Sequence, residues 1–311
     1  MSIDSKFRVV VAGRGVQGEK RLSVAGTDVA ATVDPRRSDV DFSTVFDVPV
    51  ESYDAALLCI PDESKYELIE YLIANGKHVL VEKPLLVSST QFDRLLSIQE
   101  ETRALVYVAY NHRFEPHVAS LREALRAGRL GRPYSVTLSY GNGTAALVRE
   151  SEWRDEGLGV IPDLASHLLD MVDFWWGLEG REISVIDARH FENRAYDYAL
   201  LRLSGEPVVY METSMVSWRN HFRADVQASN GSAHISSLCK WGPSSLTIRD
   251  RKFPSGRPDE SVMTLVMPDP TWQAEYLAFK ELVASGSLGN LGTSMRIARL
   301  LHDVAQQLEG K

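Results

Sequence analysis

The stretch that decides the fold is FRVVVAGRGVQG, residues 7–18. Its first six residues, Phe7 to Ala12, form an apolar run that favours a strand covered on both faces. The run passes directly into G-x-G-x-x-G, a pattern typical of a strand-to-helix turn that holds the pyrophosphate of a dinucleotide. The first glycine permits the tight turn, the second lets the backbone approach the phosphates, and the third lets helix and strand pack closely. The predicted phosphate-binding residues are Gly13, Arg14, Gly15, Val16, Gln17 and Gly18.

An acidic residue follows the next expected strand, residues 28–33, about twenty positions after the first glycine. This residue, Asp34, is expected to hydrogen-bond the adenine ribose hydroxyls and to repel a 2′-phosphate, which favours NAD. Arg36 and Arg37 follow closely and could bind such a phosphate instead. NAD is therefore the expected cofactor, NADP is the alternative, and Arg36 joins the predicted cofactor-binding residues.

The first third of the chain alternates short apolar runs with helical stretches. Further strands are expected at 55–60, 78–81 and 105–110, with helices at 65–75 and 89–101. This alternation predicts an α/β Rossmann-type, doubly wound parallel sheet over residues 1–115. Only about twenty residues separate Asp34 from Asp54, which leaves little room for a helix between the second and third strands.

The pattern changes after Pro116, where strand-like stretches follow one another without intervening helices. This succession predicts that residues 116–311 form an α+β domain with a mostly antiparallel open sheet. The roles expected of this second domain are substrate binding and oligomerisation. The expected strands span residues 134–140, 183–189, 198–203, 208–216, 222–228 and 233–236, and the expected helices span 117–127, 162–176, 272–285 and 294–308. The charged run from Arg249 to Lys252 is expected to be a solvated turn.

The carboxyl ends of parallel strands form the ligand crevice of a doubly wound sheet. Lys83 follows one of these strands, and Pro84 restricts its backbone, so the lysine is held at the crevice. A partly desolvated lysine can transfer a proton, although a solvated surface lysine is the more common case. The predicted cofactor-binding residues at these strand ends are Ile60, Pro61, Glu82, Lys83, Pro84, Asn111 and Arg113.

A second group of polar residues lies on the helix expected at 162–176. Asp163 and His167 are four residues apart and share one helical face, which Asp170 is expected to join. These three side chains could suggest a metal site, but no further histidine or cysteine cluster completes a coordination shell, so no metal is expected.

Together these motifs resemble the Gfo/Idh/MocA oxidoreductase family. The resemblance rests on the glycine loop, on Gly76-Lys77-His78-Val79 leading into Glu82-Lys83-Pro84, on Asn-x-Arg-Phe-x-Pro at 111–116 and on Asp-x-x-x-His at 163–167. Such relatives oxidise a ring hydroxyl of a sugar or cyclitol, or reduce the corresponding ketone. The resemblance implies that Lys83 transfers the proton of the substrate hydroxyl, that His167 assists, and that Asp163 hydrogen-bonds the substrate and orients His167. Pro84 would shape the wall near the nicotinamide.

The chain also departs from the family pattern. A histidine often found before the second helix is replaced by Lys65, and the glycine expected between the Asp and His of the catalytic helix is Ala165. The usual triple glycine ahead of that helix is Gly157-Leu158-Gly159.

Composition and net charge limit the classes of protein to which the chain can belong. A net charge of −8 argues against a uniform nucleic-acid surface, and no apolar run is long enough to span a bilayer. With two cysteines and no apolar leader, a cytoplasmic location is expected.

The alternatives to a sugar or polyol dehydrogenase are a non-catalytic, NAD-responsive regulatory protein and a reductase of an imine or linear tetrapyrrole. The set Lys83, Asp163 and His167 favours catalysis on a polyhydroxylated small molecule. An open sheet usually needs covering, so a homo-oligomer, dimer or tetramer, is expected.

Overall fold

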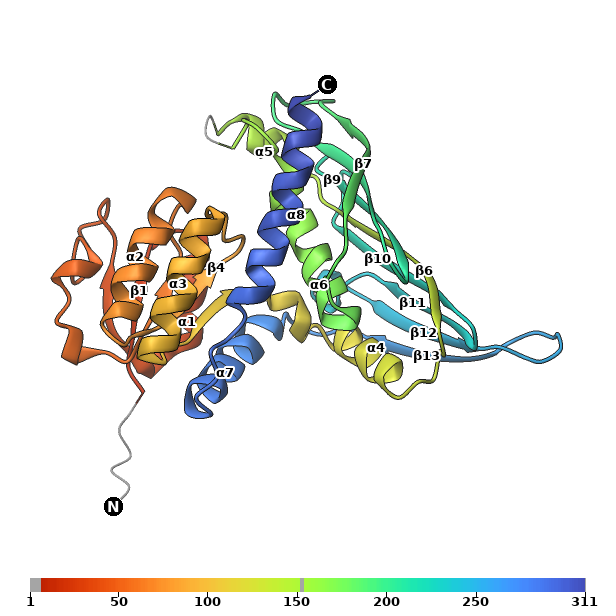
Figure 1. The fold of residues 1–311 in the computed structure, drawn as a ribbon, viewed down its shortest axis with the longest axis horizontal. Coiled ribbons are helices and arrows are strands. Elements are labelled where there is room, and N and C mark those ends of the chain that lie inside the picture. Colours follow the sequence, from red (N-terminus) through yellow and green to blue (C-terminus); the bar gives the residue numbers. More distant parts are fainter. Residues whose placement is uncertain (1–6, 152–153, 311) are drawn as a thin grey trace, which may run out of the picture. The chain divides into compact units, whose positions relative to one another are not determined.

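A computed structural model describes residues 7–151 and 154–310 of the chain (Figure 1). Its contacts divide the chain into two compact units, Met1–Asn111 with Trp272–Ala298, and His112–Thr271 with Arg299–Lys311. The predicted division after residue 115 differs from this grouping, because residues 272–298 join the first unit. There Glu275 binds Arg21, and the side-chain amide of Asn290 bonds with the backbone of Val108.

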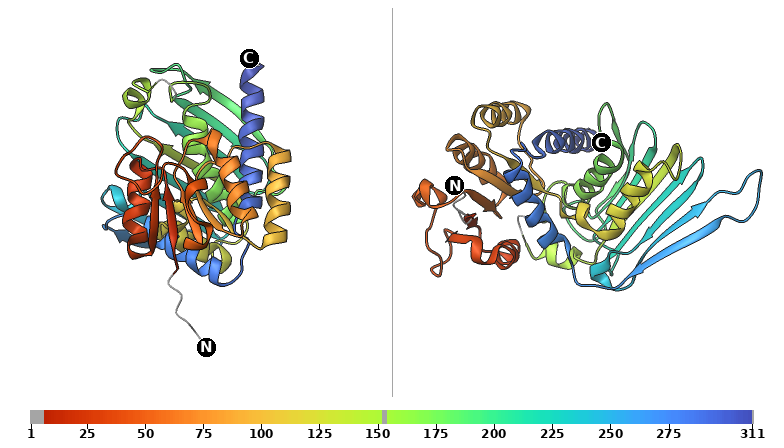
Figure 2. Two further views of the ribbon diagram at one scale, coloured as in Figure 1. Left: turned by 90° about the vertical axis from the view of Figure 1, so that its left-hand side faces the viewer. Right: turned by 90° about the horizontal axis from the view of Figure 1, so that it is seen from below.

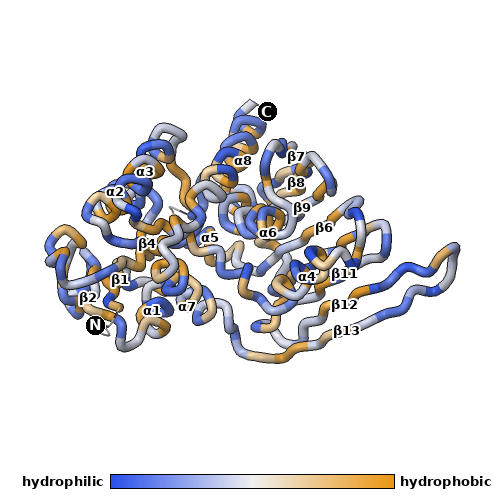
Figure 3. Tube along the Cα trace, turned by 60° about the horizontal axis from the view of Figure 1, so that its bottom comes forward, coloured by the Kyte–Doolittle hydropathy of each residue, from blue (hydrophilic) through white to orange (hydrophobic). Residues whose placement is uncertain are grey.

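The first unit contains a five-stranded parallel sheet in the order β2-β1-β3-β4-β5. The strands are β1 Val9–Ala12, β2 Val29–Val33, β3 Ala55–Leu58, β4 His78–Glu82 and β5 Val106–Ala109. Helix α1, Val16–Ala25, covers one face, while α2, Asp62–Ala74, and α3, Ser89–Thr102, cover the other (Figure 2). Every residue of β1 and β3 is buried and these strands are strongly hydrophobic (Figure 3), so the predicted doubly wound sheet is confirmed.

The connection from β2 to β3 contains only two short 3-10 turns, Val45–Asp47 and Val50–Ser52. The expected lack of a helix here is confirmed. Helix α7, Thr271–Ala284, and α8, Leu291–Glu309, follow the last strand of the chain, and the division between the two units falls within α8.

The second unit contains an eight-stranded sheet in the order β13-β12-β11-β10-β6-β9-β8-β7. Its neighbours are antiparallel except for β6 and β9, which are parallel. The strands are β6 Pro133–Gly141, β7 Ile183–Arg189, β8 Tyr198–Leu203, β9 Val208–Ser214, β10 His221–Ala228, β11 Gly231–Ser236, β12 Ser244–Asp250 and β13 Asp259–Leu265.

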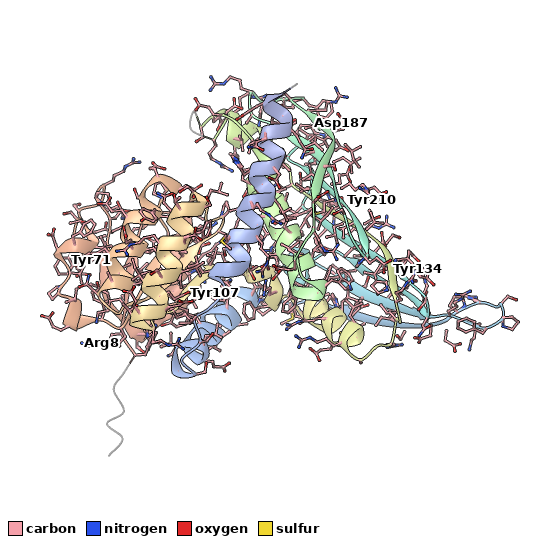
Figure 4. The ribbon with its side chains drawn as sticks, viewed as in Figure 1. Arg8, Tyr71, Tyr107, Tyr134, Asp187 and Tyr210 are labelled. Atoms are coloured by element: carbon pink, nitrogen blue, oxygen red, sulfur yellow. The ribbon has the colours of Figure 1, made fainter. Side chains whose placement is uncertain are left out.

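Helices cover one face of this sheet and leave the other open. Helix α4, Pro116–Arg126, packs on β11 and β12, and a π-helical turn, Ile161–Ala165, packs on β6 and β9 and leads into α6, Ser166–Trp176. Side chains of β6 alternate accordingly: Val136 and Leu138 are buried, whereas Thr137 between them is exposed. The exposed side chains of Tyr134, at the irregular start of β6, and of Tyr210 on β9 point away from α6 (Figure 4). The predicted, mostly antiparallel open sheet is confirmed.

Three elements were not expected from the sequence: helix α5, Ala145–Arg149, and the strands β12 and β13. The prediction of a solvated turn over residues 249–252 is wrong for its first half. Arg249 and Asp250 end β12, where Arg249 forms an ion pair across the ladder with Glu260 of β13. Among the described residues, no helix combines the length and apolarity needed to cross a membrane.

Candidate functional site

The glycine loop between β1 and α1 has the geometry of a phosphate-binding turn. Gly13 has a φ of +86°, and a Cβ there would lie 2.2 Å from the carbonyl oxygen of Cys59. A Cβ on Gly18 would lie 1.7 Å from the carbonyl oxygen of Gly13, so this glycine lets α1 pack against the strand. A Cβ on Gly15 would meet no atom of the described chain within 4 Å. The backbone at Gly15 is therefore open to an approaching ligand at the N-terminus of α1, where N–H groups attract anions.

Asp34 follows β2 and faces this loop. Its carboxylate accepts hydrogen bonds from the backbone N–H groups of Arg14 and Arg36, both at 2.8 Å. Partial burial acts to raise the pKa of Asp34, but these two hydrogen bonds and the nearby arginines outweigh it and hold the pKa below its usual value. The residue predicted to bind the ribose is therefore an anion placed beside the glycine loop.

Of the two arginines that could bind a 2′-phosphate, Arg37 has acidic partners, and so does Arg14 in the glycine loop. Glu19 pairs with Arg14 at 3.0 Å and with Arg37 at 3.2 Å, and Arg37 also pairs with Asp39 at 2.6 Å. The residues present thus fit NAD, because carboxylates surround the cationic groups on the adenosine side.

The segment Glu82-Lys83-Pro84 leaves the carboxyl end of β4. The Glu82 carboxylate accepts a hydrogen bond from Arg21 Nε at 2.8 Å, and the Arg21 guanidinium also binds Glu275 at 2.6 Å. Burial acts to lower the pKa of Arg21, but the two carboxylates raise it, so the guanidinium stays charged although it is fully buried. Lys83 is half-buried, and Ile60 and Pro61 follow β3 at the same edge of the sheet.

The second unit gathers three polar and aromatic side chains, His112, Tyr140 and Asp163, around His167. The rings of His112 and His167 are stacked, with centroids 4.1 Å apart and an interplanar angle of 24°. Tyr140 lies 5.4 Å from His112 and 6.0 Å from His167, measured between centroids. Burial raises the pKa of Tyr140, and the charge of Asp163 raises it further, which places this carboxylate near the cluster.

Sequence reasoning found Asp163 and His167 but missed His112 and Tyr140. His112 stands inside the Asn-x-Arg-Phe motif, so its position was visible, but nothing in one sequence shows that its ring stacks on His167. Tyr140 continues the alternation of buried residues Val136 and Leu138 on β6, which was the available signal.

Asp170 and Arg113 form a separate ion pair. The Arg113 guanidinium binds the buried Asp170 carboxylate at 2.6 to 2.9 Å and also binds Asp173 at 3.1 Å. Burial raises the pKa of Asp170 to about 6, against the opposing effect of Arg113. The carboxylate predicted to join the Asp163 and His167 face therefore faces Arg113, and the predicted cofactor contact of Arg113 stays a prediction. Within residues 7–151 and 154–310, no three potential metal-ligating side chains cluster.

Comparison with known proteins agrees with these two units. Residues 7–110 match the model of an oxidoreductase family with an NAD-binding Rossmann fold, and residues 118–234 match the Gfo/Idh/MocA C-terminal domain. The chain belongs to the Gfo/Idh/MocA oxidoreductase family. Its first unit is accordingly an NAD-binding Rossmann domain of that family.

Individual members of the Gfo/Idh/MocA family resemble the chain to different extents. It is 26% identical over 186 residues to an inositol 2-dehydrogenase of Rhizobium meliloti, a match covering 57% of this chain and 56% of the relative. The chain thus spans about half the length of this curated relative.

Among solved structures, an oxidoreductase of Desulfitobacterium hafniense described as NADPH-dependent has a TM-score of 0.85 at 15% identity, covering 98% of this chain and 96% of that one. Levoglucosan dehydrogenase, in complex with NADH and levoglucosan, has a TM-score of 0.81 at 17% identity, covering 98% and 97%. At these identities the likeness shows the fold.

Proposed function

We propose that the protein is an NAD-dependent oxidoreductase acting on a hydroxyl or keto carbon of a sugar, sugar derivative or cyclitol. The observation that carries the proposal is the presence of Lys83, Asp163 and His167 in the motifs through which the chain resembles the family, together with the burial of His167 against His112. The names of an inositol dehydrogenase and a levoglucosan dehydrogenase among the similar proteins support a polyhydroxylated substrate.

The residues of the first unit would hold the cofactor, which supplies the hydride acceptor or donor when it is bound. The N–H groups at the start of α1 and the loop from Gly13 to Gly18 would bind the pyrophosphate, and Asp34 would bind the ribose hydroxyls. Pro84 would shape the wall beside the nicotinamide.

Proton transfer would fall to the chain's own side chains. Lys83 would remove the proton from the substrate hydroxyl as the hydride leaves the adjacent carbon, and would return it in the reverse direction. Asp163 would accept a hydrogen bond from a substrate hydroxyl and orient His167, which would assist the transfer. These roles would need no metal ion, because the side chains would compensate the negative charge that develops on the substrate oxygen.

The test is a screen of sugars, cyclitols and sugar acids with NAD and with NADP, following the absorbance of the reduced nicotinamide. Turnover of at least one panel member is expected, with NAD preferred. Failure of the whole panel by a protein that binds NADH would favour the regulatory alternative.

A first prediction concerns Lys83 itself. Lys83→Met should lower kcat by at least about a thousandfold with the best substrate of the panel, because general acid–base catalysis contributes factors of this order. NADH affinity, measured by fluorescence titration, should change less than about threefold, since the base does not hold the phosphates. Full activity of this variant would remove Lys83 from the mechanism.

A further inference from the structure

Lys65 is a buried cation that contacts the backbone on both sides of Lys83. Its side chain, on α2, is 2% exposed. The ammonium donates to the carbonyl oxygen of Glu82 at 2.7 Å and to that of Pro84 at 2.7 Å, and pairs with Asp62 at 2.6 Å. The two carbonyl groups belong to the residues immediately before and after the proposed proton-transferring lysine.

Burying a lysine ammonium costs folding free energy, which argues that Lys65 has a specific role. Lysine is rarely fully buried unless it is paired, and an ammonium removed from water loses solvation that its partners must replace. Burial lowers the pKa of Lys65, whereas Asp62 acts in the opposite direction and Lys83 adds to the lowering. The influence of Lys83 indicates that the two ammonium groups are close enough to interact.

The same short segment is also held by its side chain. Arg21 binds the Glu82 carboxylate and is itself fixed by Glu275, and the guanidinium lies 4.4 Å from the centroid of the Trp272 ring. The segment from 82 to 84 is thus fixed through a carboxylate by Arg21 and through two backbone carbonyls by Lys65. Few rotations about the backbone remain that would move Lys83 without breaking one of these bonds.

We propose that Lys65 is a positioning residue that sets the direction of the Lys83 side chain by bridging the carbonyls of Glu82 and Pro84. The inference rests on the proposed function of Lys83 as the proton-transferring residue. An ammonium group has three donors, and in Lys65 they match its three partners, the two carbonyl oxygens and Asp62.

The experiment compares Lys65→Met with a matched control, Lys77→Met, in the full-length protein. Lys77 also donates to a backbone carbonyl, that of Tyr53 at 2.9 Å, but it precedes β4 rather than following it. With the panel substrate that wild type turns over fastest, Lys65→Met should lower kcat about 10- to 100-fold, since a displacement near 1 Å of a catalytic group has this effect. Substrate KM and the NADH dissociation constant should change less than about threefold, because the glycine loop, Asp34 and Asp163, the main proposed binding groups, lie outside the loosened segment.

Lys65→Arg, which keeps the charge and several donors, should restore kcat to within about threefold of wild type. If Lys65→Met does not fold, Lys65→Gln carries the same test, since its shorter neutral amide cannot reach both carbonyls. A kcat within twofold of wild type in the Met or Gln variant overturns the proposal, and so does an equal loss in Lys77→Met. Full activity of Lys83→Met would overturn the proposed function instead, so the two failures are distinguishable.

Discussion

Asp34 and the charged residues around it lie where the adenosine half of the cofactor is proposed to bind. Asp34 faces the glycine loop through two backbone hydrogen bonds, and Glu19 neutralises Arg14 and Arg37. A 2′-phosphate would be repelled by the Asp34 carboxylate, and it would have to break an ion pair to bind Arg14 or Arg37. The preference for NAD is therefore expected to depend on both acidic residues.

The prediction that follows is a change of cofactor preference in Asp34→Ser combined with Glu19→Gln. Removing both negative charges should raise the ratio of kcat/KM for NADP over NAD by at least about a hundredfold, because each factor of ten needs only about 1.4 kcal/mol. Steady-state kinetics with both cofactors measure the ratio. Glu19→Gln alone should produce the smaller part of the change. An unaltered ratio in the double variant would show that other residues select the cofactor.

The Arg113–Asp170 pair carries a prediction on stability. The buried Asp170 carboxyl keeps its proton in the folded state up to about pH 6, whereas an unfolded chain releases it near pH 4. The folded state binds more protons between these values, so this group's contribution to the free energy of unfolding falls as pH rises through the window. Between pH 4 and 6, the free energy of unfolding of wild type, taken relative to that of Asp170→Asn, should therefore fall by on the order of 2 kcal/mol.

Denaturant unfolding at several pH values measures this difference. The control is Thr264→Ala, on the exposed edge strand β13. This variant removes no titratable group, so its profile should run parallel to that of wild type. Parallel profiles for Asp170→Asn as well would show that Asp170 is ionised throughout the window.

The residues proposed for the site could be named from the sequence, but their contacts could not. The glycine loop, Asp34, Lys83, Asp163 and His167 stand in sequence motifs with particular residue types at fixed spacing, and their roles stay predictions. The bonds of Lys65 to two carbonyls and the stacking of His112 on His167 join residues 17 or more positions apart, and only the folded chain brings them together.

At the scale of elements, the turn from β1 into α1 offers a matched pair of substitutions. Gly15→Ala adds a methyl group where the described chain leaves open space, at a φ of −79° that alanine adopts readily, so the free energy of unfolding should change by less than about 0.5 kcal/mol. The NADH dissociation constant should nevertheless rise at least about tenfold, because the methyl group obstructs the pyrophosphate.

Gly18→Ala should lower the free energy of unfolding and should raise the NADH dissociation constant less than Gly15→Ala does. Its methyl group would overlap the carbonyl oxygen of Gly13. Overpacking of this kind costs about 1 to 3 kcal/mol of stability. Denaturant unfolding and NADH titration of both variants measure the two effects. Equal stability losses in the two variants would contradict the assigned division between binding and packing.

Strands that are buried on both faces were predicted well, whereas the two strands at one edge of the second sheet were missed. Strands β1, β3 and β4 are apolar because helices cover both sides of the parallel sheet. Almost every residue of β13 is exposed, so this edge strand has no hydrophobic alternation to detect. Strand β12 does alternate, with Leu246 and Ile248 buried, but the charges that end it resembled a turn.

At the scale of the whole molecule, the open face and edge of the second unit's sheet carry exposed apolar side chains. Tyr134 and Tyr210 are 47% and 38% exposed on the face, and Val262 of β13 is 57% exposed at the edge. A long, uncovered edge strand offers unpaired backbone groups to another chain, and exposed aromatic residues are frequent anchors of interfaces. Charged pairs cross the same face, such as Arg249 with Glu260, which suits an interface of mixed polarity.

We therefore expect a second copy of the chain to cover this sheet in a dimer or tetramer. Sedimentation of wild type should give a mass above that of one chain, and Tyr134→Glu with Tyr210→Glu should weaken association at least about tenfold, since interface tyrosines often contribute more than 1.4 kcal/mol each. Leu147→Lys, on α5 and 60% exposed, is the control and should leave the mass unchanged. A monomeric wild type would show that the open face is stable in contact with water. An unaltered mass in the tyrosine variant would show that the interface lies on another surface.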